Sequence, residues 1–573
     1  MNKPPAFRCT LVFGWLIGLS FVALALWLYR IQVVKHDHYR AIVNRMHDQR
    51  TVRAARRGDI LDRRGVVLAT SLPVRTICAD PSLIFTQRVA VATTIAPLLG
   101  MEVADVLEKL KPVVRTNAVG DPFTNQFVVL KRRVPQEVWT QVRSAMANLD
   151  LGVKARKGSG LSYALTALRT RAIFAQEGHV RQYPEQRLGA HVIGYTLPTE
   201  INTEFGTVHA EHGVTGIEAV LEQALAGAIG WKGDGADLPA RPGLNVVLTL
   251  DARVQRVVEE RIAWGREHFD AASVFAVIVR PATGEILAMA SAPSLDPANP
   301  GDPDAGQVNH VVGSLFEPGS TFKIVTIAAA LEAGLLRLEE RVNCHNGRWF
   351  YGGRYLHDYK GYGLLSFEEV LVKSSNIGTA QAALRLGPER LYHAITNFGF
   401  GSRTQIMLPS ERAGVISHPR DWSGISITLI PIGHEVMTTP LQMAMAMAAL
   451  GNGGVLMRPM LVDRLEDQNG QLVVRYSPVA VRRVLSESTA ATMLRALRGV
   501  ASQEGTARKA ELELHSLAGK TGTSEKFFGA LTSPASTTPR STPSFPPKSR
   551  SFASWWAWTN PNGWPTRAGR PPA

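Results

Sequence analysis

The sequence predicts a multidomain α/β protein with one membrane-spanning helix at its N-terminus. The chain has 573 residues, too many for one ordinary domain, and 45% of them are hydrophobic, enough to form at least two cores. An uncharged segment of membrane-spanning length lies near the N-terminus, and strand-like and helix-like segments alternate with glycine-rich connections after it. These observations favour a single anchor, a mixed α+β domain and then a second α/β domain.

The predicted anchor is residues 10–29, TLVFGWLIGLSFVALALWLY, which contain no charge. Trp27 and Tyr29 stand at its far end, where aromatic residues are common at a membrane interface. A cleavable signal peptide is the alternative, because Ala23 and Ala25 offer a small-residue cleavage site, but the apolar run continues past them. We expect an uncleaved helix in the cytoplasmic (inner) membrane, with residues 1–9 inside the cell and the bulk of the chain outside.

The remaining boundaries follow from composition. Residues 30–240 are predicted to form a basic stalk, partly helical as far as about residue 53, and a pedestal that includes a helix over 134–149. The run KGDGADLPARPG at 232–243 is typical of a linker. Beyond it, residues 244–269 predict a strand and an amphipathic helix, and residues 273–291 predict a hairpin. We therefore expect a second domain over residues 241–526.

Charge and cysteine content narrow the function classes. Lys and Arg exceed Asp and Glu by 63 to 48, a net charge of +15. This balance suits a protein that faces a membrane surface and an anionic polymer, with no need to invoke nucleic acid. The three cysteines, Cys9, Cys78 and Cys344, form no Cys-x-x-Cys pair, so the sequence indicates neither a disulfide framework nor a zinc site.

One motif places a lysine three residues after a serine. In FEPGSTFKIV (316–325), a Pro-Gly turn precedes Ser320 and Lys323, and we expect Ser320 to start an apolar helix that runs to Gly334. Side chains at i and i+3 of a helix share a face. A lysine desolvated there could lose its proton and accept one from the serine hydroxyl, which would make the serine a nucleophile. Alone, the pattern is more often a helix cap beside a solvated lysine.

Two further motifs favour the catalytic interpretation. Ser374-Ser375-Asn376 precedes a helical segment, and Lys520-Thr521-Gly522-Thr523 lies in a strand-like segment. We expect Lys520 and Thr523 to project from one side of that strand, with Gly522 leaving room for a ligand. The three motifs together would supply a nucleophile, a proton shuttle, a second cation and hydroxyls for a substrate carboxylate.

Two other motifs are incomplete. Gly519-Lys520-Thr521 resembles the end of a phosphate-binding loop, but Leu514 stands where that loop needs a glycine. His434-Glu435 resembles the start of a zinc-protease motif, but Thr438 stands where the second histidine is required. The charged residues Arg57, Asp59 and Arg63 are expected to form ion pairs in the pedestal.

The order Ser-x-x-Lys, Ser-x-Asn, Lys-Thr-Gly resembles the signature of penicillin-binding proteins and serine β-lactamases. The sequence around the motifs resembles a class B penicillin-binding protein, most closely the septal, FtsI-type branch. The resemblance is carried by FEPGSTFK, VKSSNIGTA and GKTGTSEK and by the upstream segments RRGDILDRRGVVLA and RQYPEQRLGAHVIGY. The resemblance extends from the anchor to about residue 526. Residues 431–442, PIGHEVMTTPLQ, depart from it, because His434 and Glu435 stand where the family more often has Gly-Gln-Gly or similar.

The resemblance implies a dimerisation-type pedestal and a penicillin-binding, β-lactamase-like transpeptidase domain with a central antiparallel sheet flanked by helices. It implies D,D-transpeptidation of peptidoglycan stem peptides ending in D-Ala-D-Ala during cell-wall synthesis at division, and covalent binding of β-lactams. Ser320 would be the nucleophile, Lys323 its base, Ser374 a proton relay and Asn376 a positioning residue. Lys520, Thr521, Gly522 and Thr523 would bind substrate, without a metal or cofactor. A membrane glycosyltransferase and other division proteins are the partners implied.

Three alternatives share the motifs. A D,D-carboxypeptidase differs in letting water resolve the acyl-enzyme, and a β-lactamase is usually secreted without a pedestal. A scaffold or β-lactam sensor would need no turnover.

The tail at 527–573 favours an inactive or truncated chain. No Asp or Glu follows Lys526, and residues 531–573 contain nine prolines and four of the eleven tryptophans, a composition that argues against strands and helices. Because Trp has a single codon, WWAWTNP (555–561) read one base earlier gives a Val-Gly-x-Asp pattern expected of a family strand. The hypothesis is a frameshift between about residues 527 and 550.

Overall fold

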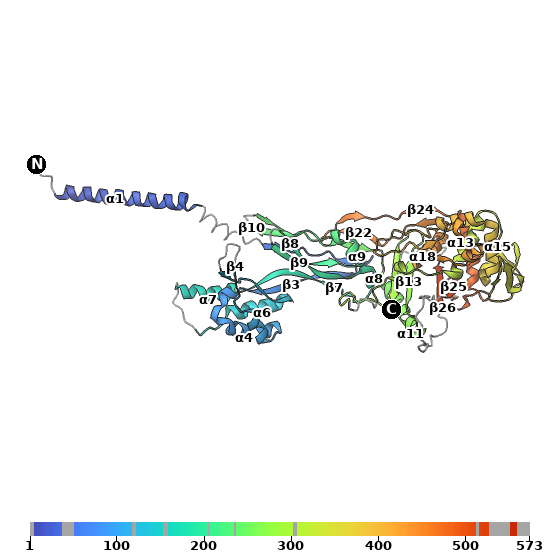
Figure 1. Cartoon of the computed structure of the whole chain (residues 1–573), viewed down its shortest axis with the longest axis horizontal. Helices are drawn as coiled ribbons and strands as arrows, with labels where there is room; N and C mark the ends of the chain where they lie inside the picture. The colour runs from blue at the N-terminus through green and yellow to red at the C-terminus, as the bar shows by residue number, and fades with distance from the viewer. Residues whose placement is uncertain are drawn as a thin grey trace, which may run out of the picture.

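The protein is elongated, with one isolated helix at one end and a helix-rich domain at the other (Figure 1). Strands of the middle part run along the long axis and connect a small helical layer to the helix-rich domain (Figure 1). The computed structural model describes residues 5–36, 51–116, 122–152, 159–203, 206–233, 236–301, 306–510, 515–525 and 550–558.

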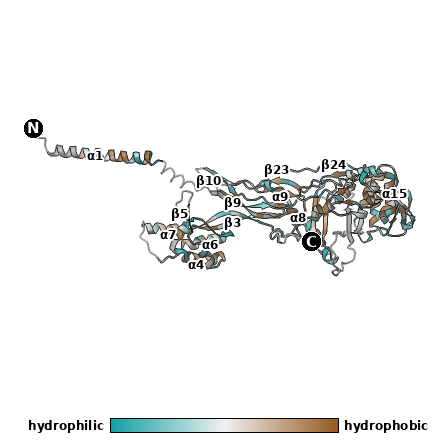
Figure 2. Ribbon diagram, viewed as in Figure 1, coloured by the Kyte–Doolittle hydropathy of each residue, from teal (hydrophilic) through white to brown (hydrophobic). Residues whose placement is uncertain are grey.

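The isolated helix is α1 (Pro5–Tyr29), which continues into a π-helical turn, η1 (Arg30–Val34). From Phe13 to Tyr29 its side chains are exposed, with Phe13 68% and Trp15 71% exposed, although this part of the helix is largely hydrophobic (Figure 2). The 22-residue span Phe13–Val34, with mean hydropathy 1.8, is long and apolar enough to cross a membrane. Most of the predicted helical stalk, residues 37–50, lies outside the described residues.

A small helical layer covers the far end of the pedestal. The long strand β3 pairs with β6 and β7 on its two sides, and four helices pack against this sheet around a separate core. The predicted helix near 134–149 is confirmed as α6, which buries Val142 and Met146 at i and i+4. The elements are β3 (Val67–Ala79), β6 (Val128–Val134), β7 (Ile173–Gln182), α4 (Arg88–Leu99), α5 (Val103–Lys109), α6 (Gln136–Ala147) and α7 (Gly160–Arg171).

One seven-stranded sheet joins the pedestal to the C-terminal half, in the order β23-β22-β12-β2-β3-β6, with β7 paired to β3. β12 (Asn245–Leu248) pairs in parallel with β2 (Ile60–Leu61) and antiparallel with β22 (Val462–Glu466). β22 also pairs with β23 (Leu472–Arg475). Segments on both sides of residue 241 therefore share one hydrogen-bonded sheet, so the two halves are joined by more than the linker.

The other pedestal elements are short. β8 and β9 form a hairpin, and β10 lies between β1 and β11 in a three-stranded sheet. They are β1 (Thr51–Arg53), β4 (Val114–Thr116), β5 (Pro122–Thr124), α8 (Ala190–Ile193), β8 (Thr196–Thr203), β9 (Gly206–Gly213), α9 (Gly216–Val220), α10 (Glu222–Leu225), β10 (Gly230–Gly233) and β11 (Ala236–Leu238).

A buried carboxylate, Glu218, stands between two arginines where the pedestal strands meet. Arg57 Nε and Arg181 Nε each donate to it over 2.6 Å, and its side chain is fully buried. The predicted ion pairs of the segment near residue 60 are confirmed: Arg57 with Glu218, Asp59 with Arg56, and Arg63 with Glu285 of the C-terminal half.

The core of the C-terminal half consists of helices packed on two of its antiparallel strand pairs. The predicted strand and helix over 244–269 and the hairpin over 273–291 are confirmed as β12 with α11 and as β13 with β14. The elements are α11 (Ala252–His268), β13 (Val274–Val279), β14 (Ile286–Ala292), α12 (His310–Gly313), α13 (Lys323–Glu332), α14 (Phe367–Lys373), α15 (Asn376–Leu386), α16 (Pro388–Asn397), α17 (Ser426–Leu429), α18 (Pro440–Gly451), β21 (Val455–Met457), β24 (Ala480–Arg483) and α19 (Glu487–Arg498).

The second strand pair includes part of the tail. β25 (Leu517–Glu525) pairs antiparallel with β26 (Arg550–Trp558) over its whole length, with Lys520 opposite Trp555. The tail therefore contains a strand, although its composition predicts none. Residues 550–558 contain no proline and are rich in tryptophan, which favours strands, whereas the prolines of 531–549 precede them.

Candidate active site

The nucleophile candidate lies on a tight turn. Gly319 has φ +54°, which only a glycine adopts without strain, and η3 (Gly319–Phe322) is a 3-10 turn. Ser320 lies in this turn, partly exposed, and α13 begins at Lys323 instead of at Ser320 as predicted. The chain thus presents the hydroxyl of Ser320 at the surface while it buries the lysine three residues later.

A second glycine holds this turn from outside. Gly433, with φ +83°, accepts a hydrogen bond from Gly319 N over 3.1 Å, and a Cβ on Gly433 would lie 2.1 Å from Gly319 O. Next to it, His434 Nδ1 lies 2.9 Å from Glu317 Oε2, and Glu435 N donates to Glu317 Oε1 over 3.0 Å. The segment that departs from the family pattern therefore packs on the residues just before Ser320.

Lys323 connects the first motif to the second. Its Nζ donates to the backbone oxygen of Ser374 over 2.6 Å, to Asn376 Oδ1 over 2.7 Å and to Ser374 Oγ over 3.2 Å. The backbone N–H of Lys323 donates to Ser320 O within the turn, but in the described part of the chain no hydrogen bond joins Lys323 Nζ to the hydroxyl of Ser320. The side chain of Lys323 is therefore oriented by the Ser-x-Asn segment.

Ser374 ends helix α14 in a left-handed conformation, φ +60°, which is rare for a residue with a side chain. This conformation stores strain, a feature that clusters at functional sites. Its Oγ accepts from Lys323 and also from Lys520 Nζ, over 2.9 Å. All three motifs therefore meet at one hydroxyl.

Both lysines are fully buried, and this changes their chemistry. Burial lowers the pKa of Lys520 to about 7. Burial and the neighbouring Lys520 hold the pKa of Lys323 well below its ordinary value, against the opposing effect of Asp358. Two positive charges this close are unfavourable, which favours a neutral amine that can accept a proton.

The third motif lies on β25. Gly522 faces the nucleophile turn, because a Cβ there would lie 2.7 Å from Thr321 Cγ2 and 3.1 Å from Pro318 O. Thr521 Oγ1 lies 2.7 Å from Thr506 Oγ1. Lys520 and Thr523 do not share a face as predicted: alternation along the strand buries Lys520 and exposes Thr523.

A further residue of the site, Asp358, lies just after β17 (Arg354–His357) and is not predicted by the sequence. Its carboxylate accepts hydrogen bonds from Ser375 Oγ over 2.7 Å and from the backbone of Asn376 and Ile377. No motif marks it, since a single aspartate in a loop carries no spacing signal.

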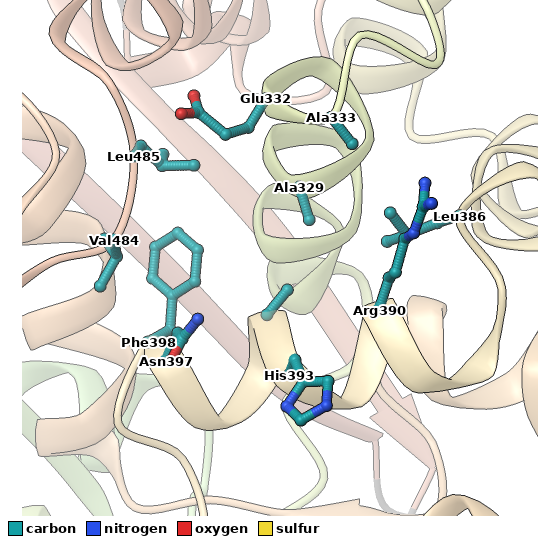
Figure 3. Close-up of a pocket in the computed structure, with 11 residues that line it drawn as sticks. Ala329, Glu332, Ala333, Leu386, Arg390, His393, Asn397, Phe398, Val484 and Leu485 are labelled. Carbon is teal, nitrogen blue, oxygen red and sulfur yellow. The ribbon is translucent and has the colours of Figure 1, made fainter.

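A separate hollow of about 270 Å³ lies at the opposite end of α13 from Ser320 (Figure 3). It contains no residue of the three motifs. It is lined by Ala329, Glu332, Ala333, Leu386, Arg390, His393, Ala394, Asn397, Phe398, Val484 and Leu485.

Two family models match the chain. The penicillin binding protein transpeptidase domain matches residues 274–562, and the penicillin-binding protein dimerisation domain matches residues 52–238. The first match includes the three motifs and extends past residue 526 to cover β26.

Curated relatives match over most of the chain. Stage V sporulation protein D of Bacillus subtilis is 31% identical over 488 residues, 82% of this chain and 69% of its own length. Penicillin-binding protein PbpB of Mycolicibacterium smegmatis is 30% identical, and the match covers 88% of this chain and 78% of that protein. Peptidoglycan D,D-transpeptidase FtsI of Escherichia coli is 29% identical, and the match covers 90% of this chain and 81% of that protein.

Solved structures share the fold. Penicillin binding protein 3 of Mycobacterium tuberculosis, complexed with aztreonam, is 28% identical with a TM-score of 0.58, covering 83% of each chain. Penicillin Binding Protein 2X of Streptococcus thermophilus has a TM-score of 0.67 at 22% identity, covering 83% of this chain and 71% of its own. Two domain models in the family's order, relatives at 30% identity and one shared fold lead to one conclusion: this chain belongs to the class B penicillin-binding proteins, most like the FtsI-type branch.

Proposed function

We propose that this chain is a serine-type peptidoglycan D,D-transpeptidase that cross-links stem peptides through an acyl-enzyme on Ser320, in the septal role of the FtsI-type branch. The observation that carries the proposal is the meeting of Lys323 and Lys520 at Ser374 Oγ, beside the turn that presents Ser320. A neutral amine and a relay hydroxyl beside a partly exposed serine are what acyl transfer requires.

The first half of the reaction forms the acyl-enzyme. Lys323 Nζ takes the proton of Ser320 Oγ as that oxygen attacks the carbonyl carbon of the D-Ala-D-Ala bond. The bond to the terminal D-alanine breaks, and its amine receives a proton through Ser374 Oγ, which already bonds to both lysines. In the second half, an amine of another stem peptide attacks the ester, and Ser320 Oγ regains its proton.

The third motif, Lys520-Thr521-Gly522-Thr523, would bind the substrate. Thr523 is exposed on β25, with Thr521 beside Thr506, so hydroxyls are available for the terminal carboxylate. Lys520, being buried, would act on that carboxylate through its charge and not as a surface ligand. The backbone N–H groups of Ser320 and Thr523 would form the oxyanion hole. These steps need no metal or cofactor.

Location and partners complete the proposal. Helix α1 would anchor the chain in the cytoplasmic membrane, with residues 1–9 inside and the catalytic domain outside. The pedestal, residues 30–240, would set the height of the transpeptidase domain, residues 241–526, above the membrane. A membrane glycosyltransferase would supply the glycan strands, and other division proteins would place the enzyme. β-Lactams would acylate Ser320.

A second candidate is an inactive or truncated penicillin-binding scaffold. The composition of residues 527–573 favours it, because a frameshift there would replace the last strands and helix of the family fold.

The test is turnover by the full-length chain in detergent micelles, with a donor peptide ending in D-Ala-D-Ala and an acceptor amine. We expect release of D-alanine together with cross-linked product. Release of D-alanine with only the free acid formed would indicate a carboxypeptidase, and no release at all would support the scaffold.

A further inference from the structure

The residue Asp358 stands at the end of a hairpin that covers the start of α15. β16 (Arg348–Tyr351) pairs with β17, and Asp358 N donates to Gly347 O over 3.0 Å, which fixes the residue to the base of the hairpin. The side chain is half-buried and directed at the Ser-x-Asn segment, as its hydrogen bonds show.

The carboxylate of Asp358 caps helix α15. Oδ1 accepts from the backbone of Asn376 over 2.5 Å and of Ile377 over 3.1 Å, and Oδ2 accepts from Ser375 Oγ over 2.7 Å. The first N–H groups of a helix have no partner within it. Ser375 Oγ accepts from Gly378 N. The first N–H groups of α15 are therefore bonded partly by the carboxylate of Asp358, which is distant in sequence, and partly by the neighbouring hydroxyl of Ser375.

The same hairpin fixes the side chain of Asn376 from the other end. Asn376 Nδ2 donates to the backbone oxygen of His357 over 2.8 Å, which leaves Oδ1 to accept from Lys323. Backbone and side chain of Asn376 are thus both held by two consecutive residues, His357 and Asp358. The position of Lys323 Nζ depends on this arrangement, because Asn376 Oδ1 and Ser374 are its hydrogen-bond partners.

Asp358 also brings negative charge to a site that holds two lysines. Among the described residues, no ion pair involves Lys323 or Lys520, so neither has a carboxylate in direct contact. The charged groups that act on Lys323 are Lys520 of β25, which lowers its pKa, and Asp358, which raises it. Its other close neighbours, Ser374 and Asn376, do not titrate in this range.

We propose that Asp358 is a positioning residue for acylation: it holds the Ser374–Asn376 segment beneath Lys323, and its charge sets the pH at which that lysine becomes a base. This inference rests on the proposed function, since it assigns Asp358 a part in the reaction of Ser320.

The experiment is the rate of fluorescent penicillin acylation by the full-length chain in detergent, measured from pH 5.5 to 9.5. Asp358→Asn keeps the shape but removes the charge, so Lys323 loses its proton more readily. We expect the half-maximal rate to move to lower pH by about half a unit. We expect the maximal rate to fall about tenfold, because the second accepting oxygen is lost.

Three variants separate charge from structure. Ser375→Ala removes the cap bond from Gly378 N and the hydrogen bond to Asp358 Oδ2 without changing charge, so it should lower the melting temperature and leave the pH midpoint in place. Asp358→Glu keeps the charge but displaces it, so the midpoint should stay and the rate should fall. Asp421→Asn removes an exposed carboxylate that pairs with Arg420, and it should match wild type in both the pH midpoint and the maximal rate.

An unchanged midpoint in Asp358→Asn, or the same shift in Ser375→Ala, would overturn the inference while leaving the proposed function intact. If Asp358→Asn does not fold, Asp358→Glu decides, and a wild-type maximal rate in it would overturn the inference. Absence of acylation in wild type would overturn the proposed function and this inference with it.

Discussion

Lys323 and Lys520 reach the same oxygen atom: Ser374 Oγ lies 3.2 Å from Nζ of Lys323 and 2.9 Å from Nζ of Lys520. One amine comes from the helix after the nucleophile turn and the other from a strand near the end of the domain. Two buried ammonium groups would repel each other across this hydroxyl, so the arrangement favours one neutral lysine. The arrangement therefore supplies a base, the neutral lysine, and a proton relay, the hydroxyl of Ser374.

The buried lysines should make stability depend on pH. Lys520 has a pKa of about 7 in the folded chain against an ordinary 10.5, so the unfolded chain binds more protons between these values. Stability should therefore rise with pH across that window, by at most about 1.4 kcal/mol per pH unit for one lysine. The measurement is chemical unfolding at pH 7 to 10, in which Lys520→Met should lose this part of the slope.

The control for this prediction is Lys232→Met, which removes a lysine whose side chain is 60% exposed. It should keep the wild-type slope. Equal slopes in Lys520→Met and wild type would mean that burial of Lys520 does not change its titration.

Gly522→Ala should disrupt the active site through a steric clash. The new Cβ would lie 2.7 Å from Thr321 Cγ2 and 3.1 Å from a backbone oxygen, so β25 must move away from the nucleophile turn. We expect a loss of about 1–3 kcal/mol in the free energy of unfolding. We also expect acylation to slow about tenfold or more, because small displacements at a reacting centre are costly.

The matched control is Gly265→Ala in α11, where a Cβ meets nothing within 4 Å. Alanine is the better helix former, so stability should hold or rise slightly. A Gly522→Ala chain that unfolds and acylates like this control would refute the close packing of β25 on the turn.

Glu218→Gln should weaken the pedestal. The variant removes the counter-charge of the buried Arg181 and leaves the buried Arg57 with Glu222 alone, a change that costs about 3–5 kcal/mol. Glu340→Gln, which breaks an exposed pair with Arg385, should cost less than about 1 kcal/mol. Unfolding curves of the two variants side by side test the difference, and similar midpoints would show that the buried cluster does not stabilise the junction.

Resequencing the coding region should show a one-base shift between about residues 527 and 550. The shifted frame turns WWAWTNP (555–561) into a strand sequence of the family. Restoring that frame should raise the melting temperature, because further strands would extend the sheet. An unbroken frame with no better alternative would end the hypothesis, and the strand pair of β25 with β26 would then be the native edge.

The site was predictable where the chemistry depends on residue types at short spacing. Ser320 lies in the turn that leads into α13 at Lys323, and Ser374 and Asn376 flank the N-cap of α15, so local sequence places each pair. The orientation of Lys520 and Thr523 was misjudged because a three-residue separation spans both faces of a strand. Asp358 was missed because its role depends on the fold of a hairpin, which no local pattern encodes.

The fold was predictable where hydrophobic periodicity is strong, as in α6, α11 and the β13–β14 hairpin. The seven-stranded sheet was not, because its pairing of β12 with β2 and β22 joins segments far apart in the chain. β26 was not predictable from the composition of the whole tail, because nine consecutive residues without proline suffice for a strand within a proline-rich segment.

The central claim is that Ser320 forms the acyl-enzyme. The most direct measurement is to label membranes carrying the full-length chain with a fluorescent penicillin and to map the adduct by mass spectrometry. We expect an adduct on Ser320 in wild type and in Ser144→Ala, which changes an exposed serine of α6, and none in Ser320→Ala. Labelling that survives Ser320→Ala, or an adduct mapped to another residue, would contradict it.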